Sequence, residues 1–228
     1  MIGDPAPLTV RRDFPRPSAQ QLAAFADVPT GFVVDAQNGT GALDHRIKPL
    51  VAEGQFAAPA MTCNLAPRDS LPVMPAIHLA QAGDVLVIGC QGFDGAAAVG
   101  DNVAQMARNQ GIVAIVTDGL VRDVDGLLAV GLPIFSCGVS PNSPYKSGPG
   151  DIGLRVAMGS VSIDPGDLLI GDRDGVVVVP RAGIDTVSAA LDEVRAAEAK
   201  LGALVKGGAT TMDWVPEYLD SDQTRYVD

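Results

Sequence analysis

"GDNVAQMARNQGIVAIVTDG" (residues 100–119) is the stretch that decides the fold. Its first half places Val103, Met106 and Ala107 at the spacing of one helix face, and the glycine that follows is a typical helix end. Its second half, residues 112–119, is a compact aliphatic run, which predicts a buried strand. A helix that leads directly into a buried strand is half of a βαβ unit, so the stretch predicts an α/β fold with parallel strands.

The same rhythm continues on both sides of this stretch. "GDVLVIGC" (83–90) is an aliphatic run behind a Gly-Asp turn, and "LPIFSCGVS" (132–140) is a third such run. Between them and the central stretch, "DVDGLLAVG" (123–131) suits a short helix or a turn. The order over residues 83–140 therefore predicts consecutive βαβ units in one sheet.

Periodicity and turn residues assign the rest of the chain: a helix capped by Ser18 (18–25), an apolar segment that ends in a glycine turn (31–43), a strand (55–66), a short helix (70–80), a loop rich in Pro, Gly and Ser (140–151), short strands joined by tight turns (153–180) and a long amphipathic helix (181–208). We expect an N-terminal arm over 1–17, a single α/β domain over 18–208 and a tail over 209–228 that docks on a neighbour.

The composition limits the possible partners. Of the 228 residues, 47% are hydrophobic and 19% are charged, which is typical of a globular domain with a full-sized core. The net charge is −11, which argues against nucleic acids and anionic membrane surfaces, because both need a basic surface on the protein. No signal peptide and no membrane-spanning apolar run is visible in the sequence, so we expect a cytoplasmic protein.

The three cysteines are Cys63, Cys90 and Cys137. Each lies in an apolar segment, and their spacing matches neither a CxxC motif nor a zinc site. We therefore expect buried free thiols in a reducing cytosol.

The segment "TDGLVRDVDGL" (117–127) places three aspartates and one arginine after a predicted buried strand. Open α/β sheets bind ligands at the carboxyl ends of their strands. There, the carboxylate of Asp123 can hold Mg²⁺ or Mn²⁺, and Arg122 can hold a substrate carboxylate or stabilise an oxyanion. The alternative is an ordinary turn with a surface Arg–Asp pair, because Asp and Gly are common turn residues. In either case Asp118 is expected to be a structural acid at the strand end.

The segment "GDNVA" (100–104) is the second candidate element. Asp101 is expected to cap the helix, which leaves the backbone N–H groups of Asn102 and Val103 free to bind a carboxylate. A plain helix cap is the alternative. Because one helix and one strand separate this segment from residues 117–127, the two should lie at neighbouring strand ends and form a joint site.

Two other kinds of site are not favoured. "GCQGFDGAAAVG" (89–100) is rich in glycine but does not contain the GxGxxG motif of dinucleotide sites. His45 and His78 are far apart in sequence, and neither pairs with an obvious Ser or Cys nucleophile, so a catalytic triad is not indicated. We expect His45 to be structural and His78 to lie in the core or on a helix surface.

Five stretches, taken in order, resemble one protein family: "GTGALDHRIKPL" (39–50), "AGDVLVIG" (82–89), "GDNVAQMARNQGIVAIVTDGLVRDVDGL" (100–127), "GLPIFSCGVSP" (131–141) and "PGDLLIGDRDGVVVVP" (165–180). This family contains the class II, metal-dependent 4-hydroxy-4-methyl-2-oxoglutarate / 4-carboxy-4-hydroxy-2-oxoadipate aldolases and the ribonuclease E activity regulator A proteins. The resemblance covers about residues 20–205. It implies a swivelling-type α/β/β/α sandwich that forms a homotrimer or homohexamer, with its sites at subunit interfaces.

The resemblance also implies roles for the charged residues. Asp123 resembles the direct ligand of a divalent metal, Mg²⁺ or Mn²⁺, and Asp101 an acid that reaches the metal through water. Arg122 resembles the residue that holds the pyruvate oxygen and stabilises the enolate. Glu198 resembles an acid that the C-terminal helix lends to the neighbouring subunit's site, with Glu193 as the second choice.

The substrate's carboxylate is expected to rest, by the same resemblance, on Gly100 and on the N–H groups of Asn102 and Val103. One departure concerns the acid that catalytic members often carry three residues after the metal-binding aspartate. Gly126 stands at that place, and the nearest acid is Asp125. Two alternatives for the substrate therefore stay open. Either Asp125 substitutes for the missing acid and the substrate is the usual one, or the enzyme acts on a different oxo acid.

These observations lead to one main hypothesis and two alternatives. The main hypothesis is a metal-dependent lyase that cleaves a 4-hydroxy-2-oxo acid to pyruvate through an enolate and also decarboxylates oxaloacetate. The first alternative is a non-catalytic, regulator-like protein that binds a protein partner, as a ribonuclease E inhibitor does. The second is a lyase of the same family that acts on a sugar acid or another oxo acid.

Overall fold

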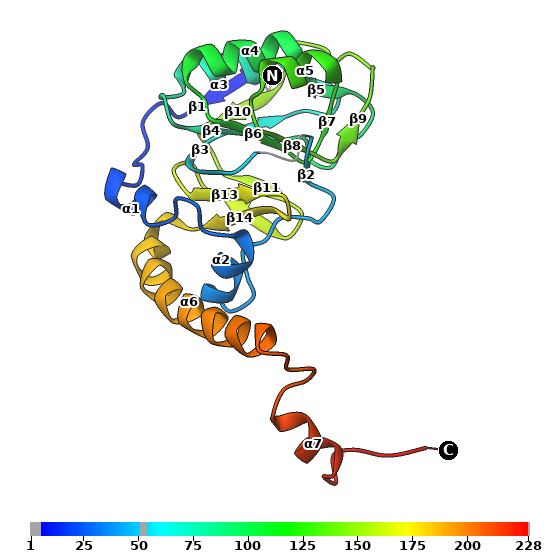
Figure 1. Cartoon of the computed structure of the whole chain (residues 1–228). Coiled ribbons are helices and arrows are strands. Elements are labelled where there is room, and N and C mark those ends of the chain that lie inside the picture. Colours follow the sequence, from blue (N-terminus) through cyan, green and yellow to red (C-terminus); the bar gives the residue numbers. More distant parts are fainter. Residues whose placement is uncertain (1–5, 51–53, 228) are drawn as a thin grey trace, which may run out of the picture. The chain divides into compact units, whose positions relative to one another are not determined.

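The computed structural model describes residues 6–50 and 54–227 (Figure 1). The chain falls into two compact units, one that ends at Leu191 and one that begins at Asp192. The division lies inside the long helix α6 (Ile184–Lys206), whose presence over the predicted range 181–208 is confirmed. The second unit also contains the short helix α7 (Trp214–Leu219). The expected domain boundaries at residues 17 and 208 stay predictions.

Four parallel strands form the centre of the first unit. They lie side by side in the order β3 (Phe56–Leu65), β4 (Val85–Gly89), β6 (Ala114–Thr117) and β8 (Ile134–Ser136). The connecting helices are α3 (Val73–Leu79), α4 (Asp101–Gln110) and α5 (Val124–Val130). The consecutive βαβ units predicted over residues 83–140 are therefore confirmed.

Strand β3 is long enough to belong to two sheets. Its residues 60–64 pair in parallel with β4, whereas its residues 56–59 pair antiparallel with β13 (Leu168–Asp172). β13 in turn pairs with β14 (Gly175–Val179) across the predicted tight turn. The other short strands of this region are β11 (Val156–Met158) and β12 (Val161–Ile163), which pair with each other. β10 (Gly150–Ile152) begins at the end of the segment 140–151, for which only a loop was predicted. The prediction of short, tightly linked strands over 153–180 is confirmed.

Alternation along the strands separates the core into layers. In β4, Leu86 and Ile88 face the helices, whereas Val85 and Val87 face the second sheet. In β14, Val176 and Val178 face the first sheet, whereas Val177 and Val179 face the helices that cover the second sheet. Since successive side chains of a strand point to opposite faces, this two-residue period fills three separate apolar layers.

Helices cover both outer faces of the paired sheets (Figure 1). Helices α3, α4 and α5 pack on the first sheet. Helix α2 (Thr30–Ala36) and the first turns of α6, through Ile184, Val187 and Leu191, pack on the second. The resulting order of layers is α/β/β/α, as expected. The predicted cap of α1 (Ala19–Ala23) is also present, because Ser18 and Gln21 form a capping box.

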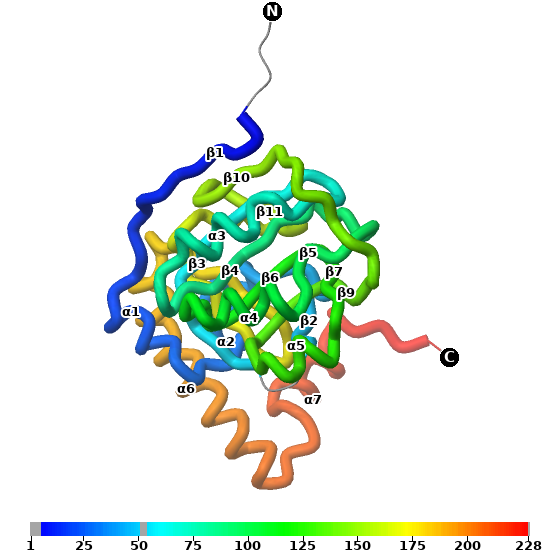
Figure 2. Tube along the Cα trace, turned by 90° about the horizontal axis from the view of Figure 1, so that it is seen from above, coloured from blue at the N-terminus to red at the C-terminus, as the bar shows by residue number. Residues whose placement is uncertain are grey.

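A further small parallel sheet was not predicted. Its strands are β5 (Ala97–Val99), β7 (Leu120–Val121) and β9 (Gly138–Val139), and each follows one of the central strands β4, β6 and β8 in the chain. Figure 2 shows the three side by side, next to the helices that they precede or follow. Strands of two or three residues carry no readable periodicity, so the sequence pattern did not separate them from the turns.

Residues 6–17 of the predicted N-terminal arm are extended, and two contacts hold them to the rest of the first unit; residues 1–5 of that arm lie outside the described residues. β1 (Leu8–Val10) pairs in parallel with β10, at one edge of the sheet. At the opposite edge, β2 (Lys48–Pro49) pairs with β8. Arg16 forms two hydrogen bonds of 2.7 Å with the carboxylate of Asp84. The Asp84 side chain is only 1% exposed.

Among the described residues, no helix combines the length and the apolar character that crossing a membrane requires.

We predict that Arg16→Ala lowers the free energy of unfolding by about 3 kcal/mol, because it leaves the buried carboxylate of Asp84 without its charged partner. Urea denaturation measures this change. The matched control is Arg155→Ala, which removes an equally bidentate pair with Asp164 whose side chains are 65% and 48% exposed. The control should stay close to the wild type. Equal losses in the two variants would show that burial of the Arg16 pair is unimportant.

Candidate functional site

The pairing of β5 with β7 brings the two candidate segments together. Val99 is the register partner of Val121, and both strands run in the same direction. The residues that follow these strands, Gly100 and Arg122, are therefore neighbours. The N–H group of Arg122 donates to the carbonyl of Val99 over 3.0 Å, which fixes this arrangement. The prediction of a joint location is confirmed, although the small sheet and not the central strands creates it.

Asp123 stands at the start of α5 in an unusual backbone conformation. Its φ of 60° and ψ of 48° lie in the left-handed region, which is uncommon for residues other than glycine. Its carbonyl accepts the first helical hydrogen bond, from the N–H of Leu127 at 2.9 Å. Aspartate tolerates this conformation better than most residues, but a strained backbone is typical of functional sites. The side chain of Asp123 is 43% exposed, so its carboxylate is open to a ligand.

Arg122 is held from two sides. Its Nε lies 3.3 Å from Oδ2 of Asp123, and its Nη1 donates a hydrogen bond of 2.6 Å to Oγ of Ser143. The adjacent Arg and Asp side chains thus point to the same place, and they form the exposed Arg–Asp pair that the ordinary-turn alternative also predicts. Sequence reasoning missed Ser143, which lies in the Pro/Gly/Ser-rich loop after the third strand. The only available signal was that this polar loop follows a neighbouring strand.

The predicted cap at Asp101 is wrong by one residue. Gly100 is the N-cap of α4, and Asp101 is the first helical residue. Its carboxylate oxygen Oδ1 accepts from the N–H of Asn102 at 2.6 Å and from the Asn102 side chain at 3.1 Å. The extended backbone of Gly100 takes the capping position, because the chain leaves β5 there. The N–H of Asn102 is therefore engaged, whereas that of Val103 lies in the first turn, which has no intrahelical acceptor.

The donor atoms fit a hard divalent cation. Among residues 6–50 and 54–227, no three His, Cys, Asp or Glu side chains converge as a preformed metal site. A cation at Asp123 would accordingly take most of its ligands from water and from a bound oxo acid. Mg²⁺ keeps several waters and prefers carboxylate oxygens, so this sparse donor set suits it.

The four other acids named in the sequence analysis have different surroundings. Asp118 accepts hydrogen bonds from the backbone N–H groups of Cys90 at 2.5 Å and Gly92 at 2.9 Å, so it is a structural acid, as expected. Asp125 is exposed in the first turn of α5. Glu198, like Glu193, is an exposed residue of the second unit, and its role in the site stays a prediction.

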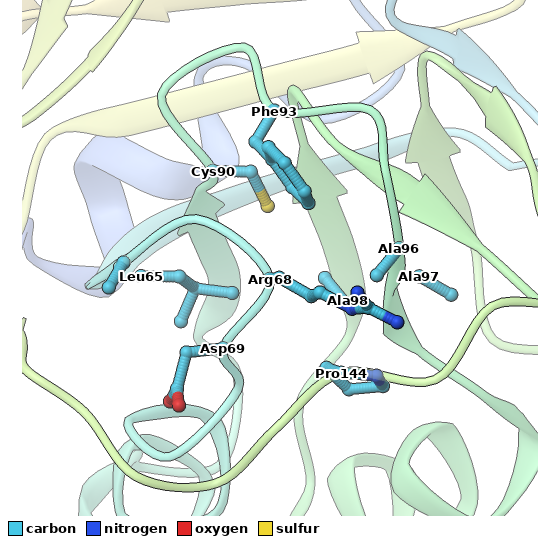
Figure 3. A pocket seen from close by; sticks show the side chains of 10 residues that line it. Leu65, Arg68, Asp69, Cys90, Phe93, Ala96, Ala97, Ala98 and Pro144 are labelled. Atoms are coloured by element: carbon cyan, nitrogen blue, oxygen red, sulfur yellow. The ribbon is translucent and has the colours of Figure 1, made fainter.

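The hollows near this edge are lined by other residues. Figure 3 shows a cavity beside Cys90, with Arg68 lying along the alanines of β5. Its volume is about 10 Å³, which is the space of roughly one water molecule and too small for a substrate. A polar cleft of about 440 Å³ is lined by Arg46, Asp118 and Cys137, among other residues. Neither hollow includes Arg122 or Asp123, and the side chains of these residues are 37% and 43% exposed, so the candidate site lies on the surface of the chain.

The two histidines do not contribute to this surface. His45 is 89% exposed and lies 3.5 Å from a carboxylate oxygen of Asp44. His78 is exposed in the last turn of α3, which is the helix-surface position that we considered for it.

Comparisons with known proteins show the family of this chain. A family model described as "Aldolase/RraA" matches residues 30–178. The chain belongs to the RraA-like family. The model covers both segments of the candidate site and ends within β14. The family recognised from the five sequence stretches is thus confirmed.

Individual relatives in the RraA-like family have names that state different functions. A Halalkalibacterium halodurans protein named "Putative 4-hydroxy-4-methyl-2-oxoglutarate aldolase" is 39% identical over 166 residues, or 73% of this chain and 79% of that protein. The structure of Streptomyces coelicolor RraAS2, described as an unusual member of the RNase ES inhibitor RraA protein family, is 26% identical with a TM-score of 0.74, over 82% of this chain and 98% of that one.

A third relative supports the fold alone. The structure of an uncharacterized protein from Pseudomonas syringae pv. tomato has a TM-score of 0.76 and 24% identity, and the match covers 86% of this chain and 97% of that one. The two chains therefore share their fold over most of their length.

The cysteines of this RraA-like chain are free thiols, as expected, but they are not equally buried. Cys63 and Cys90 are buried, whereas Cys137 is partly exposed beside the polar cleft. Burial raises the pKa of Cys63 above its ordinary value and raises the pKa of Cys90 to about 12. Desolvation also raises the pKa of Cys137, although Arg46 opposes the shift.

We predict that a maleimide labels Cys137 alone in the native protein. Only the thiolate reacts, and a raised pKa means that little thiolate is present near neutral pH. The labelling rate should therefore rise about tenfold for each pH unit between pH 7 and 8.5. Mass spectrometry counts the labels, and Cys137→Ser is the control that should abolish them. Labelling of Cys63 or Cys90 in the folded protein would contradict the burial of these thiols.

Proposed function

We propose that this RraA-like chain is a divalent-metal-dependent lyase that cleaves a 4-hydroxy-2-oxo acid to pyruvate and a second carbonyl compound. The observation that carries the proposal is the position of Arg122 and Asp123 directly beside Gly100 and Asp101. This arrangement gathers a guanidinium, two carboxylates and a helix start on one open surface. The aldolase name of the 39% identical relative supports the same reaction class.

The reaction breaks the bond between C3 and C4 of the substrate. The C4 hydroxyl loses its proton and becomes a carbonyl, while the electron pair of the broken bond stays on the pyruvate half as an enolate. Protonation at C3 then gives pyruvate. In oxaloacetate, the same bond cleavage releases CO₂ and leaves the same enolate, so we expect decarboxylation as a side activity.

Arg122 is the residue that would stabilise the negative charge of this enolate. The hydrogen bond to Ser143 and the ion pair with Asp123 hold its guanidinium in place before any substrate binds. A preorganised cation beside a developing oxyanion lowers the barrier, because no reorganisation is needed during the reaction. The N–H of Val103 at the start of α4 would receive the substrate's carboxylate, together with the backbone at Gly100.

Asp123 would hold the metal, with Asp101 reaching it through water. When bound, Mg²⁺ or Mn²⁺ supplies Lewis-acid polarisation of the oxo group. A water held by Asp101 would accept the proton of the C4 hydroxyl. Asp101 and Asp123 thus divide the two tasks of a carboxylate at such a site, ligation and proton handling.

A second copy of the chain would complete the site. In the single chain the side chains of Arg122 and Asp123 are 37% and 43% exposed, which is more open than catalysis on an enolate favours, because water quenches such intermediates. We propose that the chain forms a homotrimer or homohexamer in which Glu198 of a neighbouring subunit approaches this surface.

A regulator-like function is the second candidate. The observation that favours it is the similarity to RraAS2, which is described as belonging to an RNase inhibitor family. In this case the acidic chain would bind a protein partner and would need neither a metal nor an oxo acid. A measurement of metal-dependent pyruvate release therefore distinguishes the two proposals, because only the aldolase proposal expects such release.

We predict that the wild-type protein releases pyruvate from 4-hydroxy-2-oxo acids and from oxaloacetate with Mg²⁺ or Mn²⁺, and that EDTA abolishes the release. Arg122→Ala should lower kcat/KM by about 10²- to 10³-fold, as the loss of an oxyanion donor does. Asp123→Asn should abolish the metal-dependent release of pyruvate, because it removes the proposed metal ligand. A coupled lactate dehydrogenase assay measures pyruvate.

The controls are Arg155→Ala and Asp164→Asn, which break an exposed ion pair away from the site and should keep wild-type activity. Metal-independent turnover, or full activity of Arg122→Ala, would refute the proposed mechanism. An absence of pyruvate release, together with inhibition of a ribonuclease, would establish the regulator-like function instead.

A further inference from the structure

Gly126 is a helix residue whose glycine identity has no backbone explanation. It lies in the first turn of α5, and its φ is not in the left-handed region. Glycine weakens a helix relative to alanine, because it has more conformational freedom to lose. Helix propensity alone would therefore favour another residue at this position.

The reason for the glycine lies on the neighbouring helix. A methyl group placed on Gly126 would lie 2.5 Å from Oδ2 of Asp101 and 2.6 Å from its Cβ, whereas ordinary van der Waals contact begins near 3.4 Å. Because the Cβ of Asp101 is involved as well as the mobile carboxylate, rotation of the Asp101 side chain cannot remove the overlap. The carboxylate of Asp101 occupies the space that a side chain at position 126 would need.

Gly100 makes the reciprocal contact. A methyl group there would lie 2.5 Å from Oδ2 of Asp123 and 3.2 Å from Nε of Arg122. The start of α4 thus presents a glycine to the carboxylate of α5, and the start of α5 presents a glycine to the carboxylate of α4. At the other end of the helix pair, Arg108 of α4 donates to the carbonyl of Val130 in α5, so α4 is not free to move away.

We infer that Gly100 and Gly126 are positioning residues, which set the places of the two acids of the proposed reaction by leaving room for them. A side chain at position 126 and the present place of the Asp101 carboxylate exclude each other. In this chain the second acid therefore comes from Asp101 on α4 and not from α5. Asp125 does not take its place, since adjacent residues on a helix point about 100° apart.

This inference rests on the proposed function, and Mn²⁺ binding tests it separately from turnover. In calorimetric titrations of the full chain, Gly126→Ala and Gly100→Ala should each weaken Mn²⁺ binding about tenfold, as changes around a metal ligand typically do. The matched control is Gly31→Ala in helix α2, where an added methyl group meets nothing within 4 Å. The control should keep the wild-type Mn²⁺ affinity.

Thermal unfolding without metal gives a second readout, in which Gly126→Ala and the Gly31→Ala control should shift Tm in different ways. Gly31→Ala should keep or raise Tm, because alanine favours the helix, whereas Gly126→Ala should lower Tm because of the overlap with Asp101. In an Asp101→Gly background, which removes both the Cβ and the carboxylate that a methyl group at position 126 would meet, Gly126→Ala should cause no further loss of Mn²⁺ affinity. If the glycine acted only through general disruption of α5, the two losses would add.

The outcomes separate the inference from the function on which it rests. If the wild type binds Mn²⁺ and releases pyruvate but Gly126→Ala and Gly100→Ala bind Mn²⁺ like the Gly31→Ala control, the positioning role is overturned and the lyase stands. If the wild type neither binds Mn²⁺ nor releases pyruvate, both are overturned. Should Gly126→Ala fail to fold, Gly100→Ala decides, since the group that it meets is the end of the flexible Asp123 side chain.

Discussion

The parallel pairing of β5 with β7 is the interaction on which the candidate site depends. These strands are only three and two residues long, yet their register makes Gly100 and Arg122 neighbours. Each strand emerges from a central strand and leads to the start of a helix, so the pairing also sets α4 beside α5. The two acids, the arginine and the first turns of both helices then share one surface. Without this small sheet, the same residues would sit on separate turns.

The site accepts local costs to stability. Asp123 has a left-handed backbone, and Gly126 interrupts a short helix with the least favourable residue other than proline. Three apolar layers, one between the paired sheets and one on each outer face, stabilise the first unit and offset these costs. The rigid sandwich thereby holds a strained turn that would not persist in an isolated peptide.

The sequence pattern predicted the long-range architecture better than the details of the site. Central strands such as β4 and β6 are mostly aliphatic and fully buried, and the helix between them has an apolar face, so their type and order followed from the sequence pattern. The cap of α4 was misplaced by one residue, because Gly and Asp are both common at helix starts. Ser143 was missed, because a loop residue carries no periodic signal and its partner Arg122 lies 21 residues away.

The sequence alone determined the α/β class, the parallel units and the residue types available for chemistry, because these depend on composition and on short-range periodicity. It also showed that a glycine replaces the expected acid at position 126. Only the tertiary structure decided what that glycine does, since its overlap with Asp101 joins two different helices and two residues that are 25 positions apart in the chain. Steric exclusion of this kind depends on distances of a few tenths of an ångström, which are set by the packing of α4 against α5 and have no counterpart in sequence spacing.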